Sequence, residues 1–197
     1  MTVLTLASKS AARAQLLAAA GLAFETMGSG VDEAAAKTRL LAEDADPRDI
    51  ALALAETKAL VVSTRRPGLI IGADQTLDLD GSLYDKVAIL ADARHRLERL
   101  RGRAHQLHSG VAVARQGVVI WRETQSASLA MRDFSDGYLS AYLARNADAA
   151  LSSVGCYQLE GEGLQLFERI EGDYFTILGL PMMGLLDLLR REGVIAA

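Results

Sequence analysis

The sequence predicts a domain of the mixed α/β class, because short apolar runs typical of strands alternate along it with longer periodic segments typical of helices. The first strand pattern, at residues 3–7, leads through small hydroxyl residues into a helical segment that ends at Gly21. A buried strand at residues 69–71 continues into a hairpin, and residues 105–131 alternate as an antiparallel meander. With 197 residues, half of them hydrophobic, the chain suits one domain, residues 1–197, or two lobes sharing a sheet.

The composition limits the cellular compartment and the classes of binding partner that can be expected. No apolar run approaches the roughly 18–20 residues of a membrane-spanning helix, so no membrane contact is expected. Met1-Thr2-Val3 offers no basic residue ahead of the first strand, and the single cysteine, Cys156, excludes an internal disulfide. These features predict a cytoplasmic protein without a signal peptide. The net charge of −4 argues against general nucleic-acid binding but leaves room for a local basic pocket.

The strand at residues 69–71 leads into polar side chains, which is unusual for a buried run. Asp74 and Gln75 follow it, and after the turn residues Asp80-Gly81 the chain returns with Lys86. A two-residue turn places Gln75 opposite Lys86 with Asp74 as the diagonal neighbour, whereas a bulge at the glycine places Asp74 opposite Lys86. The acid and the lysine are either a surface pair worth about 0–1 kcal/mol or part of a site.

A second candidate site lies where the first strand meets the first helix. Ser10 is the expected N-cap of that helix, and Ser8 precedes it in the turn. Backbone N–H groups at a helix N-terminus point outward, and the helix dipole favours an anion there. Arg13, in the first turn, can reach the same anion with its guanidinium fork; the alternative is an ordinary capped helix with a solvated arginine.

Two further charged residues stand out by their positions. Glu33 follows a glycine-flanked segment and is a candidate metal ligand, the alternative being a solvated loop acid. Lys58 lies on the apolar stripe of the helix that begins at Asp46-Pro47. Its ammonium either extends along apolar surface to water or turns into a cleft where it meets an anion.

The remaining segments complete the expected architecture. Residues 34–44 form either a helix or a mobile flap, and the arginines of a helix at 88–101 are expected to face solvent because acidic residues alternate with them. His105 and His108 are three apart on a strand, so they point to opposite faces and cannot share a metal ion. We further expect strands at 105–115, 118–122 and 126–131, a helix at 133–146, a glycine-rich loop at 152–163, two strands within 164–180 and a helix at 182–191.

Together these stretches resemble the Maf-like nucleotide pyrophosphatase family over nearly the whole chain. Each matching piece is short, but their order and spacing make the resemblance specific. The pieces are S-K-S-A-A-R-A-Q-L-L at 8–17, V-D-E at 31–33, A-E-T-K-A at 55–59, I-G-A-D-Q at 71–75, D-K at 85–86, G-R-A-H at 102–105, G-C-Y-Q-L-E-G-E-G at 155–163 and G-D-Y-F-T-I-L-G-L-P at 172–181.

The resemblance implies a mixed α/β fold with a strongly twisted sheet, two lobes around a central cleft, and a homodimer. It also implies hydrolysis of a nucleoside triphosphate to the monophosphate and pyrophosphate with a divalent cation, Mg²⁺, Mn²⁺ or Co²⁺. On this likeness Asp74 is the catalytic aspartate and Glu33 its acidic companion, and both would bind the metal. The other implied site residues are the cations of the triphosphate clamp, Arg13, Lys58 and Lys86 (the last also counted as catalytic), and the phosphate-binding Ser8 and Ser10.

Base preference follows from three positions of the same resemblance. Gln75 and Glu160 match the branch that prefers 7-methylguanosine triphosphate, whereas threonine and glutamine are typical of the branch for thymidine and uridine triphosphates. A glutamate accepts hydrogen bonds from guanine N1–H and from its exocyclic amine, and a methylated, cationic base adds attraction. The third position, Ala12, departs from the arginine or aromatic residue usual there.

Two other functions remain open from the sequence. The first is a pyrophosphatase with broader or different base preference, of the type that acts on thymidine or uridine triphosphate. The second is a nucleotide-binding regulator, for instance of cell division, with little turnover.

Overall fold

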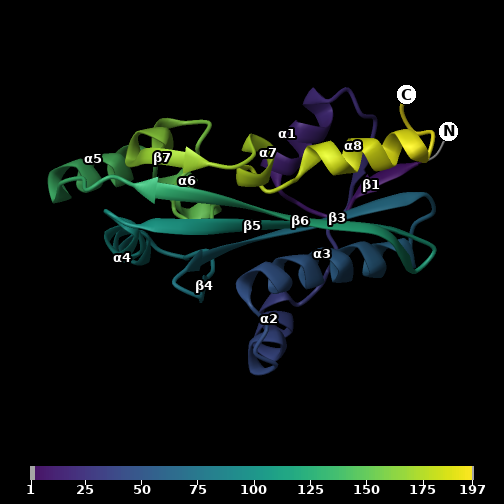
Figure 1. Ribbon diagram of the computed structural model, residues 1–197, viewed down its shortest axis with the longest axis horizontal. Coiled ribbons are helices and arrows are strands. Elements are labelled where there is room, and N and C mark those ends of the chain that lie inside the picture. Colours follow the sequence, from purple (N-terminus) through teal and green to yellow (C-terminus); the bar gives the residue numbers. More distant parts are fainter. Residues whose placement is uncertain (1–2, 197) are drawn as a thin grey trace.

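Seven strands of the described chain form one mixed sheet in the order β2-β1-β3-β5-β6-β7, with β4 paired to β3 beside this path (Figure 1). This computed structural model describes residues 3–196, so Met1 and Thr2, on which part of the signal-peptide expectation rests, lie outside it. β1 runs parallel to β2 and β3, and the other pairs are antiparallel, which confirms the predicted mixed α/β fold. The strands are β1 (Leu4–Leu6), β2 (Glu25–Thr26), β3 (Leu69–Leu79), β4 (Ser82–Tyr84), β5 (Ala104–Arg115), β6 (Val118–Met131) and β7 (Phe167–Glu171).

Helices cover both faces of the sheet. Figure 1 shows α2 and α3 below the central strands, α1 and α8 above them, and α4, α5 and α6 around one end of β5 and β6. None of the described helices is both long enough and apolar enough to cross a membrane. The helices are α1 (Ala11–Ala19), α2 (Glu33–Ala42), α3 (Pro47–Ser63), α4 (Leu90–Leu100), α5 (Asp136–Arg145), α6 (Ala147–Ser152), the 3₁₀ helix η1 (Glu162–Leu166), α7 (Tyr174–Ile177) and α8 (Met182–Arg191).

Local side-chain chemistry sets where several helices begin. The Ser10 hydroxyl accepts a hydrogen bond from the third backbone N–H of α1 at 3.4 Å, as predicted for an N-cap. The Asp46 carboxylate does the same for α3 at 2.8 Å, and Pro47 occupies the first helical position, where its missing N–H costs nothing. The segment 34–44, left open between helix and flap, is helical over most of its length as α2.

The β3–β4 hairpin has the two-residue turn rather than the bulge. Leu79 pairs with Ser82, and the two turn residues, Asp80 and Gly81, have φ of 54° and 78°. Positive φ at both positions matches the right-handed twist of the flanking strands. β4 ends at Tyr84, so Lys86 lies beyond the strand on which it was expected.

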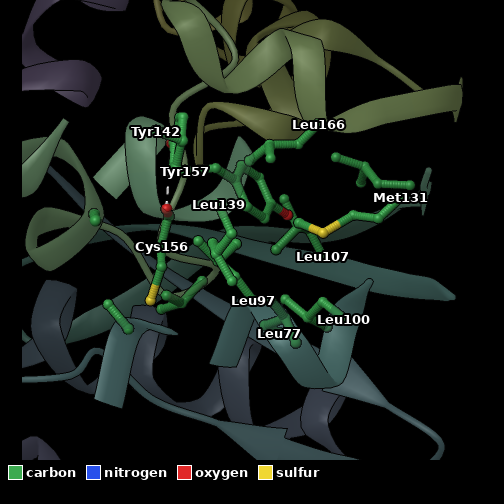
Figure 2. Close-up of a cluster of buried hydrophobic side chains, with 14 of the residues drawn as sticks. Leu77, Leu97, Leu100, Leu107, Met131, Leu139, Tyr142, Cys156, Tyr157 and Leu166 are labelled. Atoms are coloured by element: carbon green, nitrogen blue, oxygen red, sulfur yellow. Dashed lines mark hydrogen bonds between the residues drawn. The ribbon is translucent and has the colours of Figure 1, made fainter. Parts of the chain in front are cut away.

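Two hydrophobic cores lie at opposite ends of β3 and β5 on one face, in agreement with the two predicted lobes. One core joins Leu6 of β1 and Ile71 of β3 to helices α1 and α8. The other joins Leu77 of β3 and Leu107 of β5 to helices α4, α5 and α6, and Figure 2 shows its side chains, including Tyr142 and Tyr157. Burial of these side chains holds each lobe on the shared sheet.

The edge of β3 between the lobes has no strand partner. β1 pairs with residues 69–71 of β3, and β4 pairs with residues 77–79 on the same edge. Residues 72–76 are paired only on the other side, where β5 runs alongside. This gap opens the middle of β3, including Asp74 and Gln75, to a cleft from its edge.

Helix α3 lies unusually close to the sheet because two glycines face it. A Cβ at Gly72 would lie 2.1 Å from the carbonyl oxygen of Ala55, and one at Gly110 would lie 2.5 Å from that of Ala51. Alanines on the facing side of the helix complete this small-residue contact. The N-terminal end is fixed as well, because the Thr76 hydroxyl donates to the carbonyl of Pro47 at 2.7 Å.

Two sequence predictions about strands are wrong. Residues 118–131 form the single strand β6 instead of two, because the backbone pairing with β5 continues through residues 123–125 despite their polar side chains. The segment 164–180 contains one strand, β7, and the short helix α7 where a second strand was predicted. There Asp173 accepts from the N–H of Thr176 at 2.8 Å, and this cap outweighs the strand preference of the residues that follow.

We expect Gly72→Ala to lower the free energy of unfolding by more than about 3 kcal/mol, because the new methyl group meets helix backbone rather than a movable side chain. The measurement is urea unfolding at neutral pH. Gly137→Ala is the control. Gly137 lies in helix α5, and a Cβ added there would have no neighbour nearer than 3.9 Å. A Gly72→Ala protein as stable as the Gly137→Ala protein would contradict the close contact.

Candidate active site

A cleft with a volume of about 640 Å³ opens at the gap in the edge of β3. It receives side chains from both lobes and from both faces of the sheet. All ten residues singled out from the sequence line it, namely Ser8, Ser10, Ala12, Arg13, Glu33, Lys58, Asp74, Gln75, Lys86 and Glu160.

A lysine between two carboxylates stands at the floor of the cleft. Lys58 Nζ lies 2.6 Å from Asp74 Oδ1 and 2.8 Å from Glu33 Oε1. Lys58 and Asp74 are each only 5% exposed, so their charges are compensated by each other and by Glu33 rather than by water. Of the two possibilities for Lys58, the cleft is therefore the one realised.

The second oxygen of Asp74 has no hydrogen-bond partner among the described residues. Asp74 Oδ2 is buried and makes no hydrogen bond within the described protein. A buried carboxylate oxygen is rarely left unsatisfied, so this atom is suited to a ligand, a cation or a water molecule. No three His, Cys, Asp or Glu side chains of residues 3–196 gather as a complete metal centre. Asp74 and Glu33 nevertheless fit Mg²⁺, which uses one or two carboxylates together with substrate phosphates.

Arg13 is fixed beside the gap in β3. Its guanidinium donates to the carbonyl of Ala73 at 2.9 Å, to that of Gly179 at 2.8 Å and to the Ser8 hydroxyl at 3.3 Å. Burial lowers the pKa of Arg13 below its ordinary value, and the charges of Asp74 and Glu33 act in the opposite direction. The cation is thus held in place before any ligand arrives.

The N-terminus of α1 borders the same space. Ser8 accepts from the N–H of Ser10 at 3.2 Å and also from Arg13, so the turn, the helix start and the guanidinium form one connected group. The helix start, the serines and the guanidinium therefore lie together as the sequence predicted, and binding of an anion there stays a prediction.

Lys86 is the cation with the fewest restraints. Its ammonium has no ion-pair or hydrogen-bond partner among the described residues, although it lines the cleft. Burial by the surrounding protein, and then the positive charge of Arg13, lower the pKa of Lys86. An anion in the cleft would relieve this repulsion between the two cations.

Gln75 belongs to a polar row that crosses the sheet between the two cores. Its neighbour on β5 is Ser109, whose neighbour on β6 is Gln125. Gln75 Nε2 lies 3.0 Å from Ser109 Oγ and 2.9 Å from the carbonyl oxygen of Ile177 at the end of α7. With the amide nitrogen held by acceptors, the side-chain oxygen of Gln75 is the atom left for a ligand.

The base-selecting residues named from the sequence lie at different depths. Gln75 is half-buried, Ala12 is half-buried on the first turn of α1, and Glu160 is exposed. Glu160 stands on the segment 152–160, which closes the cleft on the side of the second lobe.

The sequence reasoning missed two residues around the cleft. Lys37 of α2 forms an ion pair with Asp85, the residue before Lys86. Arg96 of α4, expected to face solvent, instead donates to backbone carbonyls of residues 85 and 154. Its spacing from the buried Ala93 and Leu100 places it near the apolar side of α4, and this pattern could have revealed it.

The geometry of the cleft is typical of an enzyme that acts on a ligand with several negative charges. Three cations and a helix N-terminus surround an acid pair in one cleft of an α/β fold. Such a cleft suits a ligand that carries several negative charges and a reaction that needs a carboxylate beside them.

Comparison with known proteins gives the family. The family model described as Maf-like protein matches residues 3–192, and the chain belongs to this family. A "Nucleoside triphosphate pyrophosphatase" of Caulobacter vibrioides is 62% identical over 195 residues, covering 99% of this chain and 98% of that protein. Proteins named "7-methyl-GTP pyrophosphatase" from Brucella abortus and Rhizobium meliloti are 48% and 49% identical; they cover 98% and 99% of this chain, and 98% of each of those proteins is covered.

We expect Lys58→Met to lower the free energy of unfolding by about 3–5 kcal/mol, because it leaves the buried Asp74 carboxylate without its partner. Lys86→Met is the matched control and should cost less than about 1 kcal/mol, because that ammonium has no ion-pair partner among the described residues. Both values come from urea unfolding at pH 7. Equal losses in the two variants would mean that the acid pair does not depend on Lys58.

Proposed function

We propose that the protein hydrolyses a nucleoside triphosphate to the monophosphate and pyrophosphate. The observation that carries the proposal is that Asp74 shares one cleft with the cations Arg13, Lys58 and Lys86. The names of the relatives, at 48–62% identity over nearly the full chain, support the same activity. The reaction breaks the bond from the α-phosphorus to the bridging oxygen, and water supplies the new P–O bond.

The chain's own groups would bind and orient the triphosphate. Arg13 and Lys86 face the cleft and would pair with phosphate oxygens, while the N-terminus of α1 with Ser8 and Ser10 would hold a terminal phosphate. Because Arg13 is already fixed by two backbone carbonyls, little of its motion remains to be lost on binding. A bound phosphate would also favour the charged form of Lys86, whose pKa is lowered by burial and then by the charge of Arg13.

Asp74 would act through the oxygen that the protein leaves free. Lys58 holds Oδ1, so Oδ2 would face the cation or the attacking water. When bound to Asp74 and Glu33, a divalent cation such as Mg²⁺, Mn²⁺ or Co²⁺ would neutralise phosphate charge and lower the pKa of a water molecule. Lys58 would hold both carboxylates in position.

For the base we propose a preference for 7-methylguanosine triphosphate. Glu160, an exposed residue of the cleft wall, would accept hydrogen bonds from guanine N1–H and the exocyclic amine, and Gln75 would contribute its free oxygen. Ala12 leaves the third position without a polar contact. Two of the relatives carry 7-methyl-GTP in their names, which supports this choice over a pyrimidine.

The alternatives are separated by pyrophosphate release. Comparable rates with 7-methylguanosine, guanosine, thymidine and uridine triphosphates would indicate an enzyme of broad base preference. Binding of a nucleotide without release of pyrophosphate, in the presence of Mg²⁺, Mn²⁺ or Co²⁺, would indicate a nucleotide-binding regulator. The homodimer, the cytoplasmic location and the single-domain organisation stay predictions from the sequence.

Asp74→Asn should reduce pyrophosphate release at least about a thousandfold, because the amide can neither bind the cation as a carboxylate does nor accept the proton of water. Asp78→Asn is the control, since it lies on the same face of β3 but outside the cleft. Circular dichroism and urea unfolding would establish that both variants are folded. Retained turnover in Asp74→Asn would exclude the proposed role of this carboxylate.

Glu160→Gln should lower the ratio of kcat/KM for guanine over uracil nucleotides about tenfold, because one acceptor for the base becomes a donor. The protein fold should be unaffected, since Glu160 is exposed. Glu168→Gln, an exposed acid on β7 that does not line the cleft, is the control. An unchanged ratio would show that Glu160 does not select the base, and it would not contradict the proposed hydrolysis.

A further inference from the structure

Two segments of the cleft wall have irregular backbone, and each carries a side chain with its own proposed role. Residues 85–87 follow β4 and present Lys86, and residues 153–161 follow α6 and present Glu160. Neither segment belongs to a helix or strand, so ladder hydrogen bonds do not fix them. Side-chain contacts behind the cleft wall therefore contribute to their positions, together with turn hydrogen bonds such as that from the N–H of Cys156 to the carbonyl of Ser153 at 3.4 Å.

One guanidinium joins these two segments. Arg96 NH1 donates to the carbonyl of Asp85 at 2.9 Å and to the carbonyl of Val154 at 2.6 Å. The planar group also lies over the Tyr84 ring, with 4.5 Å between Cζ and the ring centroid. Arg96 is half-buried on α4 and does not itself line the cleft.

Lys86 depends on this contact more than the other cations do. Arg13 is held by backbone carbonyls and Lys58 by two carboxylates, but the ammonium of Lys86 has no partner among the described residues. The backbone of the preceding residue is therefore the part of the chain that determines where Lys86 stands. Arg96 is the side chain that holds that backbone from behind.

The second segment, residues 153–161, is held by contacts with the protein interior. Two residues after Val154 stands Cys156, a non-glycine residue with φ of 61°, and the next residue is Tyr157, whose hydroxyl lies 2.6 Å from His105 Nε2. The Ser153 hydroxyl donates to the carbonyl of Tyr157 at 2.7 Å, which closes the turn. The Arg96 contact adds the link between this turn and the Lys86 segment.

We propose that Arg96 is a positioning residue for the reaction. It holds the segment 85–87 so that Lys86 faces the phosphates, and it joins this segment to the segment 153–161, which carries Glu160. The inference rests on the proposed function for the role of Lys86, but the coupling of the two segments does not. A hydrogen-bonded arginine between two carbonyls is pre-organised, so its loss frees both segments at once.

Arg96→Met tests the proposal, because methionine keeps an unbranched stem over Tyr84 and removes both hydrogen bonds. The control is Arg99→Met, from the same helix; Arg99 lies over the same ring at 5.5 Å but makes no hydrogen bond within the described chain. We expect Arg96→Met to lower kcat/KM with guanosine triphosphate at least about tenfold and Arg99→Met to leave it within about twofold.

A double-mutant cycle with Lys86→Ala distinguishes positioning from general damage. If Arg96 acts through Lys86, Arg96→Met should cost less than about threefold in the Lys86→Ala background. The same fold-loss in both backgrounds, or no loss in either, overturns the proposal. Should Arg96→Met fail to fold, Arg96→Gln, which retains one donor group, is assayed in the same cycle against the same outcomes.

Hydrogen exchange gives a readout that does not require activity. The amides of Cys156 and Tyr157, which donate to the carbonyl and to the hydroxyl of Ser153, should exchange at least about tenfold faster in Arg96→Met, and at the wild-type rate in Arg99→Met. Unchanged exchange at both amides overturns the coupling even if the enzyme is active. Faster exchange in Arg96→Met, together with no release of pyrophosphate from any triphosphate by the wild-type protein, would support the coupling and refute only the proposed function.

Discussion

The arrangement of the site depends on how closely α3 approaches the sheet. Gly72 and Gly110 leave no side chain between the strands and the helix, so backbone of α3 rests almost directly on β3 and β5. That distance allows Lys58 to reach Asp74 at 2.6 Å while both stay buried. A bulkier contact would move the helix outward and leave the Asp74 charge without compensation, which is costly in a water-poor interior.

The opposite face of the sheet carries polar side chains that need hydrogen-bond partners in the interior. Gln75, Ser109 and Gln125 form a polar row between two apolar cores, and the carbonyls at the end of α7 satisfy the first two. The Ser109 hydroxyl donates to the carbonyl of Thr176 at 2.7 Å, and both residues are 0% exposed. Such a row lowers the apolar area of the interior, but its hydrogen bonds also fix the amide of Gln75 in one orientation.

Local chemistry made much of the fold predictable. The caps at Ser10 and Asp46, the proline that follows the latter, and the Asp80-Gly81 turn each act over a few residues, and the structure shows them as expected. The site was predictable in part, because the sequence placed polar groups at the ends of apolar segments and the resemblance named their roles.

Longer-range features were not readable in the same way. The length of β6 depends on pairing with β5, and α7 depends on a cap that competes with strand-forming residues. The sequence of the helix alone could not predict the partner of Lys58, because a lysine on an apolar stripe can also extend along the surface until its ammonium reaches water. Arg96 shows the reverse case, in which helical spacing contained the information and the surrounding charges obscured it.

The unpaired edge of β3 has a consequence for how this chain can vary. Asp74 and Gln75 are consecutive, so they project to opposite sides of one strand, yet both line one cleft beside the unpaired edge at residues 72–76. Deleting one residue of β3 ahead of them would exchange the two sides and send the carboxylate toward the polar row and the amide toward Lys58. Length changes at the Asp80-Gly81 turn lie beyond both residues, so they would not exchange the two sides, although they would shift β4 and the Lys86 that follows it.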